Sequence, residues 1–482
     1  MTHTPIMQTE PIFKPLCYHG EGRFTFLNIT DTFHGWNMGD HGALWTYNLN
    51  YMDWLEQEDI TIEECEKWID RFIDDLTDNH IGQDPYPIAL RIINWIKFFC
   101  KHPECQSKRR NDSMYAQTLL LERKLEYHLL GNHLLEDSYA LTIAAIYFHD
   151  FRLFRKASGL LRKQLNEQIL PDGAHYEQSP MYHCILLDRL LDCINFSLNN
   201  YLFDGQTVFT DFLCQQAARM LGHLQSIIYA DGSIPLLNDA ANGIAPTATQ
   251  LFRYAERLGI RWQPLNLGAC GYRKLSTSSM ELIADIGNIS ATYQPGHSHA
   301  DTFSYELRIG GQQVIVDTGI STYNKNQRRQ YERSTAAHNT VSVDGLDSSQ
   351  VWGGFRVGKR ATVTVLQDTF SELIARHDGF GRNVIHQRRF LLTANELCIE
   401  DHIIGQPTHA VSYLHFSPQL HATIVSREEG IIKVGPATIK IEGFSDLKLT
   451  KNSVSTEYNH LQVCDMLIAY FSQQLKYTIS QI

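Results

Sequence analysis

The sequence predicts a segregated α+β protein in which a helical N-terminal domain precedes a C-terminal antiparallel β-sandwich. From about residue 40 to 265, apolar residues recur at spacings of three and four, which is the helical period. After about residue 280 the pattern becomes short alternating runs separated by Gly-Gly, Asp-Gly and Asn-Glu turns, which is typical of antiparallel strands. We therefore predict a helical domain over residues 1–270 and a β-sheet domain over residues 271–482.

The bulk properties are those of a multidomain globular protein without a strong charge bias toward nucleic acid. A chain of 482 residues is too long for one small core. The net charge of −11, with no Lys/Arg block longer than residues 108–110, argues against nucleic-acid and anionic-membrane partners. Ten scattered cysteines without a C-x-x-C pair favour free buried thiols in a reducing compartment.

The first thirty residues show no basic segment followed by an apolar one, and no run is long enough to span a membrane. We therefore expect a cytoplasmic protein, with a periplasmic or secreted location as the alternative.

The helical half contains seven segments with helical periodicity and short connections, which favour a bundle or a toroid of helical hairpins. The segments are 54–60, 88–99, 119–130, 139–154, 159–170, 182–194 and 212–224. Stops lie between them at residues 131–132, 171–173 and 231–233.

The second half contains short runs with the alternation of strands, which predict a sandwich of large antiparallel sheets. These runs include residues 289–293, 303–307, 340–343, 361–365, 373–375 and 390–392. A cleft at the junction of the two domains is the expected place for a site.

One stretch of the second half, Pro295 to Val343, carries three potential metal ligands, His299, Asp317 and His338. Two histidines and a carboxylate form a familiar zinc set with the fourth position open. His297 lies two residues before His299, so on an extended backbone both imidazoles face the same side. The spacing is long and histidines are numerous, so buried structural histidines are the alternative.

In the helical half, a first polar cluster lies at a helix start. His133 and Glu136 are three residues apart and share a helical face, and Asn132 is placed at the capping position. The alternative is that Asn132 only caps and His133 only packs.

A second polar cluster spans residues 171–183, where a turn that includes Gln178 leads into a helix beginning near Pro180. Tyr182 and His183 therefore lie in the first turn of that helix, and a tyrosine packed between helices is the alternative. A third cluster places Arg91 and Asn94 on one face of an otherwise apolar helix, which indicates a buried or cleft-lining polar pair. A structural salt bridge from Arg91 is the equal alternative.

Tyrosine, histidine, asparagine and arginine without a pair of carboxylates fit glycoside hydrolysis poorly, because that reaction usually needs two acidic groups. They fit β-elimination beside a uronic carboxylate, where donors neutralise the carboxylate, a base removes the C5 proton and an acid protonates O4.

Five motifs in order give the chain a specific resemblance. They are R-I-I-N-W-I-K-F, G-N-H-L-L-E, D-G-A-H-Y-E-Q-S-P-M-Y-H, G-H-S-H-A-D and R-S-T-A-A-H-N-T-V-S-V-D-G. With them the chain resembles the heparinase II/III-like polysaccharide lyases, which include alginate, heparan sulfate and broader glycosaminoglycan lyases. The resemblance implies an incomplete α/α toroid followed by antiparallel β-sheets.

The resemblance also implies roles for individual residues. Asn132 and His133 correspond to the pair that contacts the substrate carboxylate, and His133 is also a candidate base. Tyr182 corresponds to the tyrosine that donates to the leaving oxygen and serves as an alternative base. His297 corresponds to a histidine that lines the cleft. The further residues assigned to substrate binding are Glu136, Arg91, Gln178, His183, Tyr331 and Arg333, with Tyr323 and Arg329 also available from the β domain.

The same resemblance implies that His299, Asp317 and His338 bind a divalent metal, most often zinc. We expect this metal to organise the loop that presents His297, because elimination needs no hydrolytic nucleophile.

The expected partner is an anionic uronic-acid polysaccharide such as heparan sulfate, hyaluronan, chondroitin or alginate, and a homodimer is the oligomer considered. One alternative function is a metal-dependent glycan hydrolase. Another is a non-catalytic glycan-binding protein, which would be expected to have lost Tyr182 or His133, and both are present.

Overall fold

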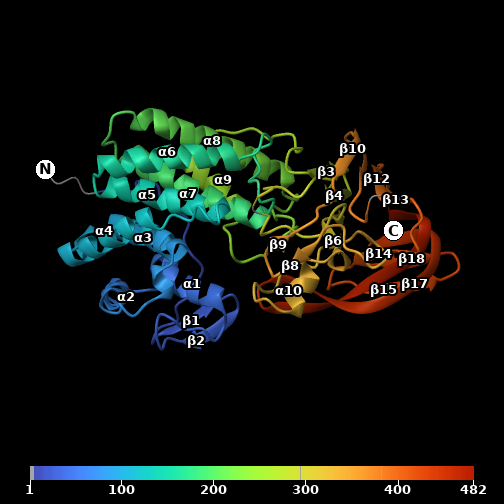
Figure 1. Cartoon of the computed structure of the whole chain (residues 1–482), viewed down its shortest axis with the longest axis horizontal. Coiled ribbons are helices and arrows are strands. Elements are labelled where there is room, and N and C mark those ends of the chain that lie inside the picture. The colour runs from blue at the N-terminus through green and yellow to red at the C-terminus, as the bar shows by residue number, and fades with distance from the viewer. Residues whose placement is uncertain (1–4, 294, 382) are drawn as a thin grey trace. The chain divides into compact units, whose positions relative to one another are not determined.

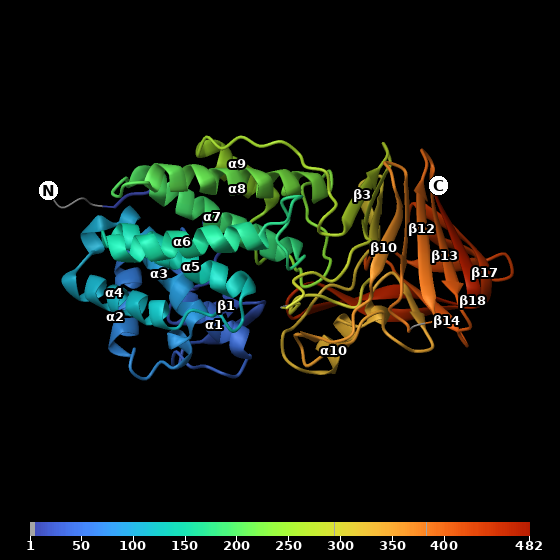
Figure 2. The ribbon, with the colours of Figure 1, turned by 45° about the horizontal axis from the view of Figure 1, so that its top comes forward.

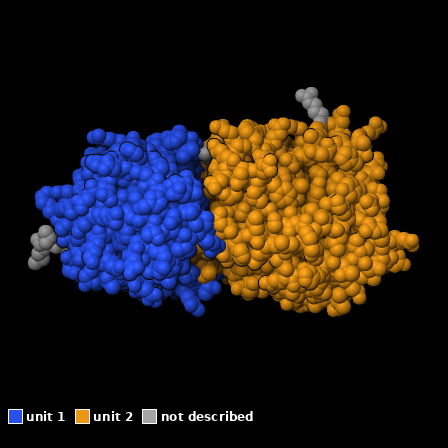
Figure 3. Space-filling view, turned by 90° about the horizontal axis from the view of Figure 1, so that it is seen from below, with its two compact units in different colours: residues 1–169, 182–222, 249–263 blue, residues 170–181, 223–248, 264–482 orange. Residues whose placement is uncertain are grey.

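The computed structural model describes residues 5–293, 295–381 and 383–482, and the chain divides into two compact units (Figure 3). Unit 1 contains the chain up to Ile169 together with Tyr182–Gly222 and Thr249–Gln263. Unit 2 contains Leu170–Met181, His223–Ala248 and Pro264–Ile482. Two segments from the helical half of the sequence therefore fold with the β-rich unit.

Unit 1 is built from helices and one small hairpin (Figure 1). The hairpin pairs β1 (Arg23–Phe26) with β2 (Ile29–Thr32). The α-helices are α1 (Ala43–Tyr51), α2 (Ile62–Asp74), α3 (Pro85–Lys101), α4 (Lys108–Arg123), α5 (Gly131–Tyr147), α6 (Phe151–Gln168), α7 (Pro180–Asn199), α8 (Gln206–Ile227) and α9 (Ala248–Arg257). Three short 3₁₀ turns join them, η1 (Asp53–Glu56), η2 (Ile81–Gln83) and η3 (Pro103–Cys105). Within the described ranges, no helix combines the length and apolar character needed to cross a membrane.

Side-chain caps fix where several of these helices begin. Thr61 accepts a hydrogen bond from the Glu64 N–H at the start of α2, in the Thr-x-x-Glu pattern of a capping box. Ser107 and Asp150 cap α4 and α6 in the same way. Pro85 occupies the first position of α3, where its missing N–H leaves no bond unmade.

Aromatic side chains form the core between the hairpin and the first helices. The ring of Trp54 lies 5.0 Å from that of Phe24 and 5.7 Å from that of Trp68, and Tyr18 packs on all three rings. The edge-to-face arrangement of Trp54 with Trp68 is a favoured geometry for aromatic pairs.

Three predicted helices differ from the structure. The predicted segment 139–154 is divided, because α5 ends at Tyr147, His149 takes a left-handed conformation with φ 56°, and α6 begins at Phe151. Residues 54–60 contain only the 3₁₀ turn η1, because Met52 takes a left-handed conformation with φ 56° and redirects the chain after α1. Residues 119–130 are helical only to Arg123, where α4 ends, and irregular turns fill the rest before α5.

Unit 2 contains two large antiparallel sheets. The smaller has the order β3 (Tyr272–Ser276), β4 (Met280–Asp285), β5 (Tyr305–Ile309) and β6 (Gln312–Ile315). The larger, seen in Figure 2, has the order β10 (Val363–Asp368), β11 (Glu372–His377), β12 (Ile385–Leu392), β13 (Glu396–Ile404), β18 (His460–Gln481), β17 (Ala437–Glu457), β16 (Ile431–Val434) and β15 (Ala422–Ser426). Its strand β14 (Ala410–His415) pairs with both β18 and β7 (Val341–Val343). Outside these sheets lie α10 (Gln327–Glu332), η4 (Thr335–Ala337) and the pair β8 (Val351–Trp352) and β9 (Arg356–Val357).

The core of unit 2 lies between the two sheets. Alternate residues of β12 are buried, as expected for a strand with one face toward a core. Leu282 and Leu307 of the smaller sheet share one cluster of buried side chains with Phe390, Ile399 and Leu467 of the larger. The predicted order of a helical region followed by antiparallel β-sheets is therefore confirmed.

One predicted strand, residues 289–293, is wrong. These residues form irregular structure because their backbone bonds side chains instead of a neighbouring strand. The Ser290 N–H donates to Oε1 of Gln178, and the Thr292 carbonyl accepts from Arg360. The ten cysteines are all free thiols, as predicted.

Candidate functional site

The first cluster of candidate residues in unit 1 lies at the start of α5. This helix begins at Gly131 with Leu130 at the cap position, so Asn132 is its second residue. The prediction that Asn132 caps the helix is therefore wrong. The Asn132 side chain is buried, whereas the His133 side chain is 32% exposed. Glu136 lies one turn further along and is fully buried.

A buried carboxylate orients the ring of His133. Nδ1 of His133 lies 3.0 Å from Oε2 of Glu126, and the ring packs 4.6 Å from the ring of Tyr86. An ionised carboxylate only accepts hydrogen bonds, so Nδ1 carries the proton and Nε2 keeps its lone pair. The half-exposed ring is therefore arranged so that Nε2 can accept a proton from a substrate.

Tyrosine phenols lie close together next to this histidine. The rings of Tyr51 and Tyr86 are 5.8 Å apart. Burial raises the pKa of both phenols well above the ordinary value, and the nearby phenol of Tyr182 raises each pKa further. Tyr182 is the third residue of α7, in the first turn as predicted, and is partly exposed. Unit 1 thus brings Tyr182 into the electrostatic neighbourhood of the tyrosine that packs on His133.

Glu136 belongs to a buried network of charges in the same unit. Its Oε2 lies 3.8 Å from Nε of Arg189, and neither carboxylate oxygen has a hydrogen-bond partner among the described residues. Burial raises the pKa of Glu136 to about 7, although Arg189 opposes this effect. Glu136 can therefore change its charge near neutral pH.

Two other predicted residues of unit 1 hold the fold together in the structure. The guanidinium of Arg91 is fully buried and donates to Oε1 of Gln117 and to the backbone carbonyls of Asn50 and Gly82. The imidazole of His183 is buried, and its Nε2 lies 3.0 Å from the backbone carbonyl of Met220 on α8.

In unit 2, Asp239 is the centre of the candidate site. Its carboxylate accepts two hydrogen bonds from Arg329, at 2.5 and 2.7 Å. Nδ1 of His297 lies 2.9 Å from Oδ2, and Nε2 of His299 lies 2.8 Å from Oδ1. Burial alone would raise the pKa of Asp239, but Arg329 and the two histidines hold it well below its usual range. Both imidazoles thus bond the same carboxylate, although residues 296 and 297 form a turn and not the extended backbone that was predicted.

Asp239 also determines which nitrogen of His297 can act as a base. Because the ionised carboxylate accepts from Nδ1, the lone pair of this ring is on Nε2. The rings of Tyr323 and Phe355 pack at 6.0 and 6.3 Å from the imidazole.

The predicted metal ligands are completely buried in unit 2. The rings of His299 and His338 are 5.2 Å apart, and Nδ1 of His338 lies 2.7 Å from Oδ2 of Asp317. Nδ1 of His299 and Nε2 of His338 have no hydrogen-bond partner among the described residues. Histidines that bind metals usually donate their other N–H to a carboxylate, as His299 does to Asp239 and His338 to Asp317. The donor types of these three residues are those that zinc uses. In the described structure, however, the Asp317 carboxylate bonds His338 and the Gly319 N–H, and the ligand atoms of His299, Asp317 and His338 do not all lie within 4.8 Å of one another.

Two arginine side chains, Arg333 and Arg388, donate hydrogen bonds to backbone carbonyls in and around the segment that contains His297 and His299. Arg333 donates through Nε and Nη2 to the backbone carbonyl of Ser298, between His297 and His299. Arg388 pairs with Asp401 and donates through Nη1 to the carbonyls of Phe303 and Asn339.

The remaining predicted residues of unit 2 are engaged with other parts of the fold. The side-chain amide of Gln178 donates to the carbonyls of Cys270 and Asn288 and accepts from Ser290. The Tyr331 hydroxyl accepts from Asn452 on β17 at 2.6 Å.

The sequence reasoning missed Glu126 and Asp239, the two carboxylates that orient the candidate histidines. Asp239 lies 58 residues before His297 in the sequence. Its only local signal is the polar group Asn238-Asp239 directly after the apolar pair Leu236-Leu237.

Comparisons with known proteins agree with this fold. The model of the heparinase II/III N-terminus matches residues 112–257, and that of the heparinase II/III-like C-terminal region matches residues 260–477. A heparin-sulfate lyase from Bacteroides stercoris is 20% identical over 337 residues, which are 63% of this chain and 48% of that protein. A heparin-sulfate lyase from Pedobacter heparinus is 24% identical over 243 residues, which are 44% of this chain and 36% of that protein.

The chain thus spans about half or less of the curated relatives it matches. A crystal structure of heparinase III covers 93% of this chain and 79% of its own, with a TM-score of 0.75 and 16% identity. This likeness shows that the fold is shared.

Proposed function

Because the chain belongs to the heparinase II/III-like family, we propose that it is a polysaccharide lyase that cleaves uronic-acid-containing glycosaminoglycans by β-elimination. The family resemblance inferred from the five motifs is confirmed by the two family models. The two curated relatives are heparin-sulfate lyases, which makes heparan sulfate the first substrate to test.

The arrangement around His133 is the observation that supports this proposal best. A half-exposed imidazole is oriented by the buried Glu126, and its Nε2 is set to accept a proton. Asn132 precedes it on α5, and Tyr182 lies in the electrostatic neighbourhood of Tyr86, which packs on the histidine ring. A base, an amide donor and a phenol are the groups that this elimination requires.

In the proposed reaction, Asn132 donates to the uronic carboxylate, which makes the C5 proton more acidic. Nε2 of His133 removes that proton for one uronic epimer, and Tyr182 removes it for the other. The electron pair of the C5–H bond forms the C4=C5 double bond as the C4–O4 bond breaks. Tyr182 gives a proton to O4 of the leaving sugar, so no water is consumed.

We assign His297 a contact with the substrate, because Asp239 and Arg333 hold its loop in one conformation. His299, Asp317 and His338 would hold a zinc ion in this proposal, and the ion would supply a fixed charge that keeps the loop in place. The other predicted substrate-binding residues would affect substrate binding indirectly, by holding loops and helices in place. They are Gln178, Arg91, His183, Tyr331 and Arg333.

The experiment is to follow the absorbance of the 4,5-unsaturated uronate while the purified protein meets heparan sulfate, hyaluronan, chondroitin and alginate. We expect a rise with at least one glycosaminoglycan and a loss of about 100-fold or more in the rate for Tyr182→Phe. Tyr201→Phe is the matched control, because Tyr201 is 61% exposed and follows the end of α7.

New reducing ends without the absorbance would overturn the lyase and favour a hydrolase. An equal loss in both tyrosine variants would remove Tyr182 from the mechanism. Binding without any cleavage would identify a glycan-binding protein.

A further inference from the structure

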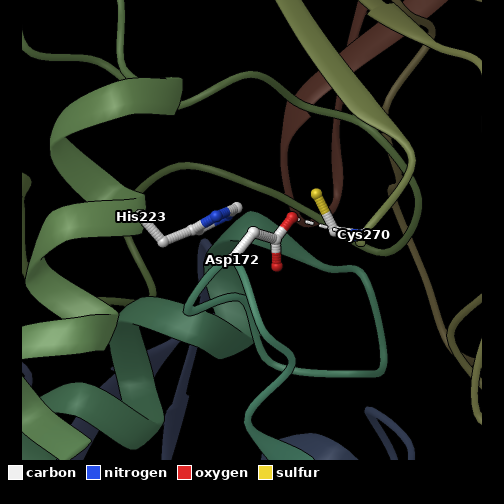
Figure 4. Close-up of side chains that lie close together, drawn as sticks. All are labelled: Asp172, His223 and Cys270. Atoms are coloured by element: carbon white, nitrogen blue, oxygen red, sulfur yellow. Dashed lines mark hydrogen bonds between the residues drawn. The ribbon is translucent and has the colours of Figure 1, made fainter. Parts of the chain in front are cut away.

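A second group of potential metal ligands lies in unit 2, apart from the residues assigned above. Asp172, His223 and Cys270 are all buried, and one ligand atom of each lies within 4.8 Å of those of the other two (Figure 4). Asp172 follows α6 in a turn, His223 is in the last part of α8, and Cys270 precedes β3.

The donor types of this group suit zinc. A thiolate, an imidazole and a carboxylate are its three usual protein ligands, and with three of them a fourth position remains. The thiolate selects against magnesium and calcium, which prefer all-oxygen sites. One thiolate and one carboxylate carry two negative charges, which balance a divalent cation and make the charged group less costly to bury.

The three residues come from the three separate segments that make up unit 2. Asp172 lies in Leu170–Met181, His223 in His223–Ala248 and Cys270 in Pro264–Ile482. A cation bound by all three would therefore link segments that are otherwise held by packing and hydrogen bonds. Such a link stabilises the folded state in the way that structural zinc sites do.

We propose that Asp172, His223 and Cys270 form a structural zinc site that ties the three segments of unit 2 together. On binding, the thiol of Cys270 releases its proton to solvent and the sulfur bonds the metal. The site is separate from His299, Asp317 and His338, and it does not depend on the proposed lyase activity.

The competing interpretation is a cluster held by hydrogen bonds alone. Oδ2 of Asp172 accepts from the backbone N–H groups of Gly268 and Cys270, at 3.0 and 2.9 Å, and Oδ1 accepts from Ala174. These bonds fix the turn without a metal, but each carboxylate oxygen has a second lone pair that a cation can use.

The test uses the full-length chain, stripped with a chelator under mildly denaturing conditions and refolded with Co²⁺ in place of zinc. We expect a thiolate-to-cobalt charge-transfer band in the near ultraviolet, which a site of two histidines and a carboxylate cannot produce. Cys270→Ser should abolish the band, His223→Gln should weaken metal binding, and His338→Gln should leave the band unchanged. Cys184→Ser is the matched control, because its thiol is equally buried but belongs to unit 1.

Zinc should also raise the thermal unfolding midpoint of the parent chain and of Cys184→Ser by more than that of Cys270→Ser, which keeps only the zinc site proposed at His299, Asp317 and His338. Circular dichroism of each variant shows whether it has folded, and Cys270→Ala provides a second substitution if the serine variant does not fold. A parent chain without the charge-transfer band, or a band that persists in Cys270→Ser, would overturn the proposal.

Discussion

At the scale of single residues, the burial of Glu136 makes the stability of the folded protein depend on pH. Its carboxyl group lies 3.8 Å from Arg189, without a hydrogen bond among the described residues. Burial raises its pKa from 4.5 to about 7. The folded protein therefore binds this proton more tightly than the unfolded chain does. The resulting stability is fully present below pH 4.5 and is lost as the pH rises through about 7.

We predict that Glu136→Gln raises the free energy of unfolding at pH 8 by on the order of 2 kcal/mol, with little effect near pH 4. The glutamine amide keeps the shape of the protonated acid and removes the buried charge. Urea unfolding of both proteins at the two pH values measures the difference.

Glu122→Gln provides a control of opposite sign. Hydrogen bonds from Arg152 lower the pKa of Glu122 to about 2. This carboxylate therefore adds stability above its unfolded pKa and loses it as the pH falls through about 2. Its glutamine variant should be less stable than the parent at pH 8.

The prediction for Glu136 would be contradicted if the parent were more stable than Glu136→Gln at pH 8. That result would show that the fold stabilises Glu136 as a carboxylate.

At the scale of elements, close backbone approach fixes where the segment after β6 meets β17. Gly319 forms a parallel bridge with Ser455 at a φ of 61°, and a Cβ on Gly319 would lie 2.1 Å from the Ser455 carbonyl oxygen. Any side chain at this position pushes two backbone segments apart. Asp317, one of the predicted metal ligands, lies two residues before this contact and accepts from the Gly319 N–H.

We predict that Gly319→Ala destabilises the protein by about 3 kcal/mol or more, because it adds a backbone clash to the strain of a positive φ. Gly345→Ala separates the two effects, since Gly345 has a φ of 73° and no atom within 4 Å of its added Cβ. This control should cost only about 1 kcal/mol. Equal losses in thermal unfolding of the two variants would mean that the backbone contact with Ser455 is not retained in solution.

The sequence could predict elements whose signal is local, and it failed where distant groups decide the structure. The helices α3, α5 and α7 could be predicted because each contains a long, mostly apolar run, as expected for a helix that is buried on almost all sides. Residues 289–293 have the composition of a strand, yet Gln178, more than a hundred positions earlier, bonds their backbone.

The same limit applied to the candidate site. The candidate histidines and Tyr182 lie in motifs that can be recognised in the sequence. The carboxylates that orient His297 and His133, Asp239 and Glu126, lie in other segments, and no spacing rule connects them with these motifs. Burial of Arg91 was one of the predicted options, but the backbone carbonyls that Arg91 and His183 contact lie on other segments and could not be identified from the sequence.

At the scale of the whole molecule, the net charge of −11 would repel the polyanionic substrate that we propose. We predict that at low ionic strength the ratio of kcat/KM for hyaluronan to kcat/KM for heparin is higher than at physiological salt. Screening shortens the reach of the repulsion to about 8 Å at 0.15 M, so added salt should favour the more densely charged chain. Initial rates at several salt concentrations measure this ratio, and a ratio that rises with salt would contradict the prediction.

The division of the chain between the two units has a consequence for biosynthesis. Unit 1 contains no residue beyond Gln263, whereas unit 2 includes the last strand, β18. Ala174, Ile227 and Leu237 leave the ribosome well before Cys270 and Tyr272, with which they share a buried cluster. A nascent chain that has just passed residue 263 can complete its helical unit while these apolar side chains still lack their packing partners. During that interval of translation the exposed apolar side chains make the nascent chain most prone to aggregate, and chaperones are most needed.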